Sequence, residues 1–192
     1  MEKNVVKWWQ ILGMGLLYLF FVFASCFAGF LHPVCWVYFS VLAAILAAGP
    51  YFWLAARWRK LGIGTFCALL VCLFCLATGE AGGFLSKLVI LGGGILSDVV
   101  RALIGNPSKK GIYCAYPILA VGNIGWVIRL WSDKQWYQEG ALEEMGTAYA
   151  QGIQSLQTTG HLVAVIILTA AAALLAIWLC SKTDKNSAKL LK

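Results

Sequence analysis

The chain has 192 residues, of which 61% are hydrophobic and only 12% are charged. Soluble domains carry about 25% charged and about 45–50% apolar residues, so one soluble core cannot hide this much apolar surface. The formal net charge of +7 lies in short clusters between apolar runs, without a nucleic-acid-binding signature. The composition therefore excludes a soluble nucleic-acid binder and predicts an all-α integral membrane protein with a single domain.

Apolar segments long enough to cross a bilayer, for which a helix needs about 20 residues, recur along the chain. They cover residues 11–31, 33–56, 61–78, 83–104, 111–131 and 161–180. We therefore expect a bundle of six transmembrane helices.

The first two apolar segments meet at Pro33. Proline suits the first turn of a helix and pushes the residue before it out of the helical region. The first helix is thus predicted to end near Leu31 and the second to begin at Pro33. This places His32 at the tip of a tight hairpin.

The fourth segment is more polar than the others and contains Ser86, Lys87, Ser97, Asp98 and Arg101, together with three consecutive glycines at 92–94. Charged residues in a spanning helix face the bundle interior or water, because exposure to lipid costs several kcal/mol. The glycines favour close helix approach or a bend, and so a helix that could move. Asp98 and Arg101 are three residues apart, which favours an ion pair between them.

The longest connection, residues 132–160, contains an apolar stripe at intervals of three and four: Leu142, Met145, Tyr149, Ile153 and Leu156. This spacing is typical of an amphipathic helix. Such a helix would lie on the membrane surface or cap the bundle as a lid. An extension of the sixth spanning helix is the other interpretation.

The basic residues indicate the orientation in the membrane. Most of them flank the same side of a six-helix arrangement: Lys3, Lys7, Arg57, Arg59, Lys60, Arg101, Lys109, Lys110, Lys182, Lys185, Lys189 and Lys192. Positively charged loops remain in the cytoplasm. We therefore expect a multi-pass protein of the cell membrane with both termini cytoplasmic, a basic tail at 181–192 and an extracellular segment at 132–160.

Enzyme signatures are absent from the sequence. It has no phosphate-binding G-x-x-x-x-G-K-[ST] loop, no H-E-x-x-H and no paired carboxylates, and its seven cysteines lie in or beside apolar runs. A rhomboid-type intramembrane serine protease would also have six helices. Its nucleophile would be Ser97, which would lie about 21 Å into the fourth helix at ~1.5 Å per residue. His161 starts the sixth helix, too far away to act as its base. We predict no catalytic residues and no metal held by the protein itself.

Polar and aromatic residues gather at the predicted outer ends of the helices, and the candidate substrate-binding set is His32, Trp36, Glu80, Lys87, Asn123, Trp126, Arg129 and His161. Binding pockets are mostly apolar or aromatic, with a few polar groups that fix the ligand's orientation. The alternative for the aromatic residues is the interfacial belt of tryptophan and tyrosine that membrane proteins carry without binding a ligand.

Two stretches carry a resemblance to a known family: "HPVCW" at 32–36 and "AAGPYFWLAARWRKLG" at 47–62, followed by a glycine-rich fourth helix and a basic link. The chain resembles the MptD-type (Trep_Strep) family of S components, the substrate-binding subunits of energy-coupling factor (ECF) transporters. The resemblance implies six membrane helices and an outward pocket for a vitamin-like molecule. It also implies partners: a T component and two cytosolic ATPases. Ala24 and Ala28 match the alanine pair with which many S components meet the T component.

The sequence leaves the substrate and one other functional class open. Haem is one candidate substrate, with His32 and His161 as axial ligands and Lys87 and Arg129 near its carboxylates. The rival is a vitamin such as a pterin or cobalamin precursor, and in neither case does the chain hold a resident cofactor. A non-transporting membrane scaffold or assembly subunit is the alternative function, which predicts no outward pocket.

Overall fold

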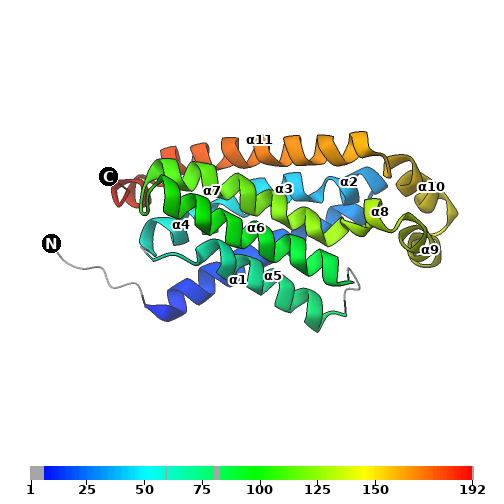
Figure 1. The fold of residues 1–192 in the computed structure, drawn as a ribbon, viewed down its shortest axis with the longest axis horizontal. Helices are drawn as coiled ribbons and strands as arrows, with labels where there is room; N and C mark the ends of the chain where they lie inside the picture. The colour runs from blue at the N-terminus through cyan, green and yellow to red at the C-terminus, as the bar shows by residue number, and fades with distance from the viewer. Residues whose placement is uncertain (1–6, 59, 80–82, 192) are drawn as a thin grey trace.

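The computed structural model of the chain describes residues 7–58, 60–79 and 83–191. All secondary structure in these residues is helical, and the longer helices lie side by side along one axis (Figure 1). The elements in chain order are α1 (Trp8–Cys26), η1 (Phe27–Phe30), α2 (Pro33–Val37), α3 (Phe39–Leu46), α4 (Ala48–Arg57), α5 (Ile63–Ala77), α6 (Gly83–Ile104), α7 (Lys109–Gly122), η2 (Asn123–Val127), α8 (Arg129–Ser132), α9 (Lys134–Met145), α10 (Thr147–Leu156), α11 (Thr159–Thr183) and α12 (Lys185–Lys189). An all-helical fold is confirmed.

Two helical segments of the described chain, Trp8–Phe30 and Thr159–Thr183, are long and apolar enough by themselves to cross a membrane. A third qualifies if α3 and α4 count as one span, although they meet at an angle of 46°. Helix α5 is apolar but shorter. The structure thus supports an integral membrane protein with two or three clear spans.

The bend between α3 and α4 has a local cause in the sequence. Pro50 lies in the first turn of α4 and has no N–H to donate to the carbonyl of Leu46, one turn earlier. Proline is the commonest cause of a sharp helix kink. The segment predicted as one helix over 33–56 is thus three shorter helices, with a break at Ala47 that Pro50 explains and a further break at Tyr38.

The hairpin at Pro33 forms as predicted. Pro33 is the first residue of α2, and His32 has extended backbone with φ −164° and ψ 143°. The His32 ring also caps the helix, because its Nδ1 accepts a hydrogen bond of 3.2 Å from the backbone N–H of Val34. An N-cap of this kind satisfies one of the donors that a helix start leaves unpaired.

Helix α6 is the central contact of the bundle and packs against both α5 and α7. Its glycines permit backbone-to-backbone approach. A Cβ atom at Gly93 would lie 2.6 Å from the Cα of Gly122, the last residue of α7. A Cβ atom at Gly94 would lie 2.7 Å from the carbonyl oxygen of Gly64 in α5. Gly92, on another face, has nothing within 4 Å. The glycine run therefore serves close packing within an unbroken helix.

The expected ion pair between Asp98 and Arg101 is wrong. Both Asp98 carboxylate oxygens accept hydrogen bonds from the start of α5: from the N–H of Gly64 at 2.9 Å, and from the N–H and hydroxyl of Thr65 at 2.8 and 2.7 Å. Arg101 donates through Nη2 to the carbonyl of Ala55 at 2.6 Å, near the end of α4. The negative group thus meets a helix N-terminus and the positive group a helix C-terminus, which the helix dipoles favour.

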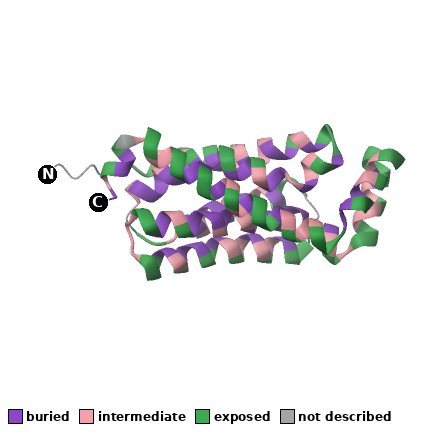
Figure 2. Ribbon diagram, turned by 90° about the horizontal axis from the view of Figure 1, so that it is seen from above, coloured by how far each residue is buried: buried purple, intermediate pink, exposed green. Residues whose placement is uncertain are grey.

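The two ends of the bundle differ. The start of α1 and the C-terminal helix α12 lie at one end, and α9 and α10 cover the other (Figure 1). At the first end α12 packs against α4, where Arg57 Nη1 donates to Ser187 Oγ at 2.5 Å. Along the bundle, exposed residues face outward and buried residues line the helix contacts (Figure 2).

The connection 132–160 contains two helices, and neither extends α11. Gly146, with φ +84°, separates α9 from α10, and Thr158 caps the start of α11 by accepting from the N–H of His161. The predicted stripe is divided by this break: Ile153 and Leu156 are buried, whereas Leu142 and Met145 are exposed. Helix α10 packs on α2 and on α9, so this segment is a cap on the bundle.

Candidate functional site

A cavity of about 510 Å³ lies beneath the cap, at the end of the bundle opposite the termini. Its lining comes from α1 and η1, α2, the end of α5, η2, α8, α9 and α10: Phe23, Cys26, Phe27, Gly29, Phe30, Trp36, Thr78, Gly79, Trp126, Arg129, Trp136, Tyr137, Gly140, Ala141, Glu144, Met145 and Tyr149. Small-molecule sites have volumes of about 300–1,000 Å³ and mostly apolar linings. The cavity has the size and character of such a site.

Trp126 forms a buried part of the cavity wall, with only 6% of its surface exposed. It lies in η2, the 3₁₀ stretch that interrupts the segment predicted as one helix over 111–131. Phe39 and Phe74 hold the indole in place, with ring centroids 6.1 and 6.2 Å from it. Its Nε1–H has no hydrogen-bond partner among the described residues.

The cap is fastened to the bundle beside the cavity by two hydrogen bonds. Trp36 in α2 donates its indole N–H to the hydroxyl of Tyr137 in α9. Tyr149 in α10 donates its hydroxyl to the backbone carbonyl of Gly29 in η1 at 2.8 Å. Gly29 itself is required there, since a Cβ at this position would lie 2.5 Å from the Trp36 ring. These bonds join α9 and α10 to the helices that form the cavity.

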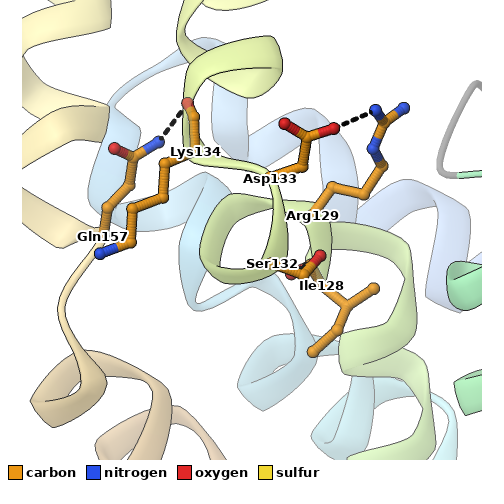
Figure 3. A network of polar contacts seen from close by, with 6 residues as sticks. All are labelled: Ile128, Arg129, Ser132, Asp133, Lys134 and Gln157. Atoms are coloured by element: carbon orange, nitrogen blue, oxygen red, sulfur yellow. Dashed lines mark hydrogen bonds and ion pairs between the residues drawn. The ribbon is translucent and has the colours of Figure 1, made fainter.

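Arg129 is the cationic residue among the described lining residues and is already engaged with its neighbours. Its Nη2 forms an ion pair with Asp133 Oδ2 (Figure 3), at a distance of 2.6 Å, and its guanidinium lies 3.3 Å from the centre of the Trp136 ring. The hydrogen bond from Arg129 holds the pKa of the Asp133 carboxyl below its usual value. This pair marks the junction where α8 turns into α9.

The same junction is tied to the far end of the cap. The side-chain amide of Gln157 donates to the backbone carbonyl of Lys134 at 3.1 Å (Figure 3). Gln157 follows α10 directly, and Lys134 is the first residue of α9. The two ends of the α9–α10 segment are therefore held together, and the segment forms a closed loop over the cavity.

The lining is suited to holding a flat ring system. Aromatic side chains from several elements line the cavity: Phe23, Phe27 and Phe30 from α1 and η1, and Trp36, Trp126 and Trp136 from α2, η2 and α9. Aromatic rings favour offset-stacked or edge-to-face contacts with one another and with ligands.

Three of the predicted substrate-binding residues come together at the cavity: Trp36, Trp126 and Arg129. Asn123 is buried beside them in η2 but does not line the cavity, and its Nδ2 donates to the Tyr18 hydroxyl at 3.1 Å. Lys87 is half-buried near the start of α6, also outside the lining. Glu80 lies outside the described residues.

The two histidines do not line the cavity. His32 is exposed and its Nδ1 serves as the cap of α2. His161 is half-buried at the start of α11, and its Nδ1 lies 2.9 Å from the hydroxyl of Tyr38. Both rings thus have structural partners, and the cavity contains no histidine that could ligate a haem iron among its lining residues.

Ala24 and Ala28 do not share a regular α-helical face. Ala24 lies in α1, but α1 ends at Cys26 and Ala28 belongs to the 3₁₀ turn η1. The change from about 3.6 to about 3.0 residues per turn rotates Ala28 away from the row of Ala24. Both are half-buried, at the cavity end of the bundle.

Sequence reasoning missed the contribution of η1 and the cap. Phe23, Phe27 and Phe30 lie in a run of residues that is apolar all round, so no periodicity marks the face that points inward. Tyr149 belongs to the predicted apolar stripe, but its hydroxyl donates to the backbone carbonyl of Gly29. The change to a 3₁₀ turn after Cys26 has no readable signal.

The fold and the site define a helical integral membrane protein with a capped aromatic cavity at one end. The family model of Trep_Strep, described as a hypothetical bacterial integral membrane protein, matches residues 10–186. The chain therefore belongs to the Trep_Strep family of bacterial integral membrane proteins. Comparisons with curated proteins and with solved structures found no match.

Proposed function

We propose that the chain is the S component of an ECF-type importer, which binds a small molecule in the capped cavity and delivers it to the cytoplasm together with a T component and two ATPases. The observation that carries this proposal is the cavity of about 510 Å³ with its aromatic lining, placed at the end of the bundle away from the termini. In this proposal the chain is a binding protein and not an enzyme.

The proposal includes six membrane spans with both termini in the cytoplasm. The spans are α1 with η1, the bent segment α2 to α4, α5, α6, α7 to α8, and α11. The placement of α1's start and of α12 at one end of the bundle, and of the basic residues in the connections at that end, supports this arrangement. The cavity and its cap then face outward.

The alternative function, a scaffold that binds no substrate, predicts no pocket. A scaffold has no need of a lining with eight aromatic side chains around a space of this size, nor of a cap fastened by Trp36 and Tyr149. The absence of a nucleotide-binding loop in the sequence also suits an S component, because its energy comes from separate ATPases.

The geometry favours a vitamin-like molecule over haem. Neither histidine lines the cavity, and the carboxylate-binding partner expected at Lys87 is also outside it. Arg129 does line the cavity but is paired with Asp133. A haem would therefore lack both its axial ligands and a free cluster of cations for its two carboxylates among the described lining residues.

Co-purification tests the assembly. The chain, expressed with an affinity tag beside the T component and ATPases of the same bacterium, should retain all three partners in mild detergent. An unrelated multi-pass protein with the same tag serves as the control and should retain none. A chain that purifies alone under these conditions would favour the scaffold.

Thiol labelling tests the orientation. In a variant whose native cysteines are replaced, Glu143→Cys in the cap should react with a membrane-impermeant maleimide on intact cells, because Glu143 is exposed. Lys109→Cys, an exposed position at the start of α7, should react only after the cells are opened. The reverse pattern would refute the outward cavity.

A further inference from the structure

One face of α9 lines the cavity. Its lining residues come in neighbouring pairs that recur every four residues, as one row along an α-helix does: Trp136 and Tyr137, Gly140 and Ala141, Glu144 and Met145. The hydroxyl of Tyr137 fixes the direction of this face, because it accepts the indole N–H of Trp36 from α2. Glu144, further along the same row, therefore lies on the cavity side of the cap.

The middle of this face leaves room for a ligand. Gly140 has no side chain, and a Cβ built there would meet nothing within 4 Å. Ala141 beside it contributes a single methyl group. The stretch between Tyr137 and Glu144 is about 10 Å long at ~1.5 Å per residue, which accommodates a bicyclic ring. A flat molecule on this face would contact aromatic rings at one end and a carboxylate at the other.

The aromatic side chains of this part of the lining are accessible. Trp136 is 39% exposed, and Trp36 and Tyr137 are half-buried. The guanidinium of Arg129 lies 3.3 Å from the centre of the Trp136 ring, so a flat cation already packs on one of these rings. The faces of tryptophan and tyrosine rings attract cations, because the π-system places negative charge there. The same lining is therefore suited to a flat cation that enters from outside.

The carboxylate of Glu144 is unpaired. Glu144 is exposed and has neither a hydrogen bond nor an ion pair with another described residue. Arg129, the cationic residue among the described lining residues, is paired with Asp133 at 2.6 Å. Because that pair carries no net charge, the described lining presents the negative charge of Glu144 to a ligand. A cation would be attracted to it, whereas an anion would be repelled.

We propose that the cavity selects a flat aromatic cation, whose ring system lies on the aromatic side chains and whose positive charge lies beside the carboxylate of Glu144. Gly140 and Ala141 supply the space, the aromatic rings supply the contact area, and Glu144 distinguishes the cation from a neutral ring of the same shape. This inference rests on the proposed function, since it names the class of molecule that the importer would carry.

Three bicyclic probes of nearly the same shape test the class of ligand. N-methylquinolinium is a permanent cation, 1-methylnaphthalene is its uncharged counterpart, and 1-naphthoate carries a negative charge. Binding to the full chain in mild non-ionic detergent is measured by equilibrium dialysis, with detergent alone as a blank for partition into micelles.

Three variants test the residues. Glu144→Gln removes the charge and keeps the shape of the side chain. Glu143→Gln is the matched control, because the adjacent Glu143 is also exposed but does not line the cavity. Gly140→Leu places a side chain in the open space of the lining. All three positions are exposed or have free space, so the variants should fold like wild type, which their Tm values check.

We expect wild type and Glu143→Gln to bind N-methylquinolinium more tightly than the other two probes, and raising the salt concentration should weaken this binding. Glu144→Gln should bind the cation about fivefold more weakly, as expected for the loss of one partly exposed ion pair, and 1-methylnaphthalene without change. Gly140→Leu should lose affinity for every probe that wild type binds.

The opposite outcomes are equally clear. Equal affinity of Glu144→Gln and wild type for the cation, or an equal loss in both glutamate variants, would refute the role of Glu144. Tightest binding of 1-naphthoate or 1-methylnaphthalene would refute the cationic class. Undiminished binding by Gly140→Leu would place the site outside the cavity, and binding of none of the probes would refute the flat aromatic class altogether.

The outcome is separable from that of the proposed function. A chain that retains its T component and ATPases but binds no probe is an S component for another class of molecule. A chain that binds the cation through Glu144 but retains no partners has the cavity as inferred and a different function.

Discussion

Gly93 offers the most direct test of the packing of α6. In Gly93→Ala the new Cβ would lie 2.6 Å from Gly122 Cα and 3.3 Å from Gly122 N, both backbone atoms that cannot rotate away. Helix α6 must therefore move away from α7, along its most extensive contact in the bundle. Overpacking of this kind costs about 1–3 kcal/mol.

Gly92→Ala is the matched control. Gly92 is the adjacent residue of the same helix, and a Cβ there has nothing within 4 Å. Alanine is the better helix former by about 1 kcal/mol, so this variant should be unchanged or slightly more stable. The two substitutions add the same methyl group, and they differ only in what it meets.

Thermal unfolding in mild detergent, followed by tryptophan fluorescence, measures both variants. At about 2–4 °C per kcal/mol for a chain of this size, Gly93→Ala should lower Tm by roughly 2–12 °C relative to wild type. Equal Tm values for the two variants, or a Gly93→Ala protein as stable as wild type, would show that α6 and α7 are not in backbone contact at this position.

Further predictions concern single polar contacts. Asp98→Asn should destabilise the fold by about 1–3 kcal/mol, because an amide cannot accept from all the donors at the start of α5. Unfolding curves in detergent measure this loss of stability, and unchanged curves would contradict the role of the Asp98 hydrogen bonds. Burial raises the pKa of Tyr149 to about 12 from an ordinary value of 10.0, so the stability due to its neutral hydroxyl, present below pH 10, should disappear as the pH rises to 12. Tyr149→Phe cannot donate to Gly29, so its Tm should not show this fall between pH 10 and 12. The same fall in Tm in the variant would show that Tyr149 is not its cause. Trp36→Phe removes the bond to Tyr137 and should speed hydrogen exchange in residues 134–145, whereas unchanged exchange would mean that the bond does not hold α9.

The predictable parts of the fold are those that the local sequence determines. Pro33 predicts the start of a helix and the hairpin before it, because its effect on the backbone does not depend on the rest of the chain. The bend at Ala47 follows from Pro50 for the same reason, yet the long apolar run hid it. Gly146 likewise divides a stripe that has the right spacing for one helix, since spacing alone does not reveal a backbone turn with positive φ.

The tertiary partners of polar groups were not predictable from spacing. Asp98 and Arg101 are near each other along α6, and an ion pair three residues apart is a sound local expectation. In the structure Asp98 instead accepts from the start of α5 and Arg101 donates through Nη2 to the end of α4, whose unpaired backbone groups are brought close by the packing of α6. A helix end is a strong competitor for a charged side chain.

The candidate site was predictable where a residue type is unusual for its setting. Trp36, Trp126 and Arg129 are large or charged residues near predicted helix ends, and all three line the cavity. The histidines drew attention for the same reason, but they serve as a helix cap and as a partner of Tyr38. Composition marks which residues are special, whereas only packing decides which of them share a space.

The C-terminal helix has a practical consequence for handling the protein. Helix α12 is folded back onto α4, with Ser187 and Leu191 buried and Arg57 bonded to the Ser187 hydroxyl. A bulky reporter or affinity handle fused directly after this helix would compete with those contacts for space. Fusions at the other end of the chain, before Trp8, leave these contacts undisturbed and suit crystallisation or single-particle work better.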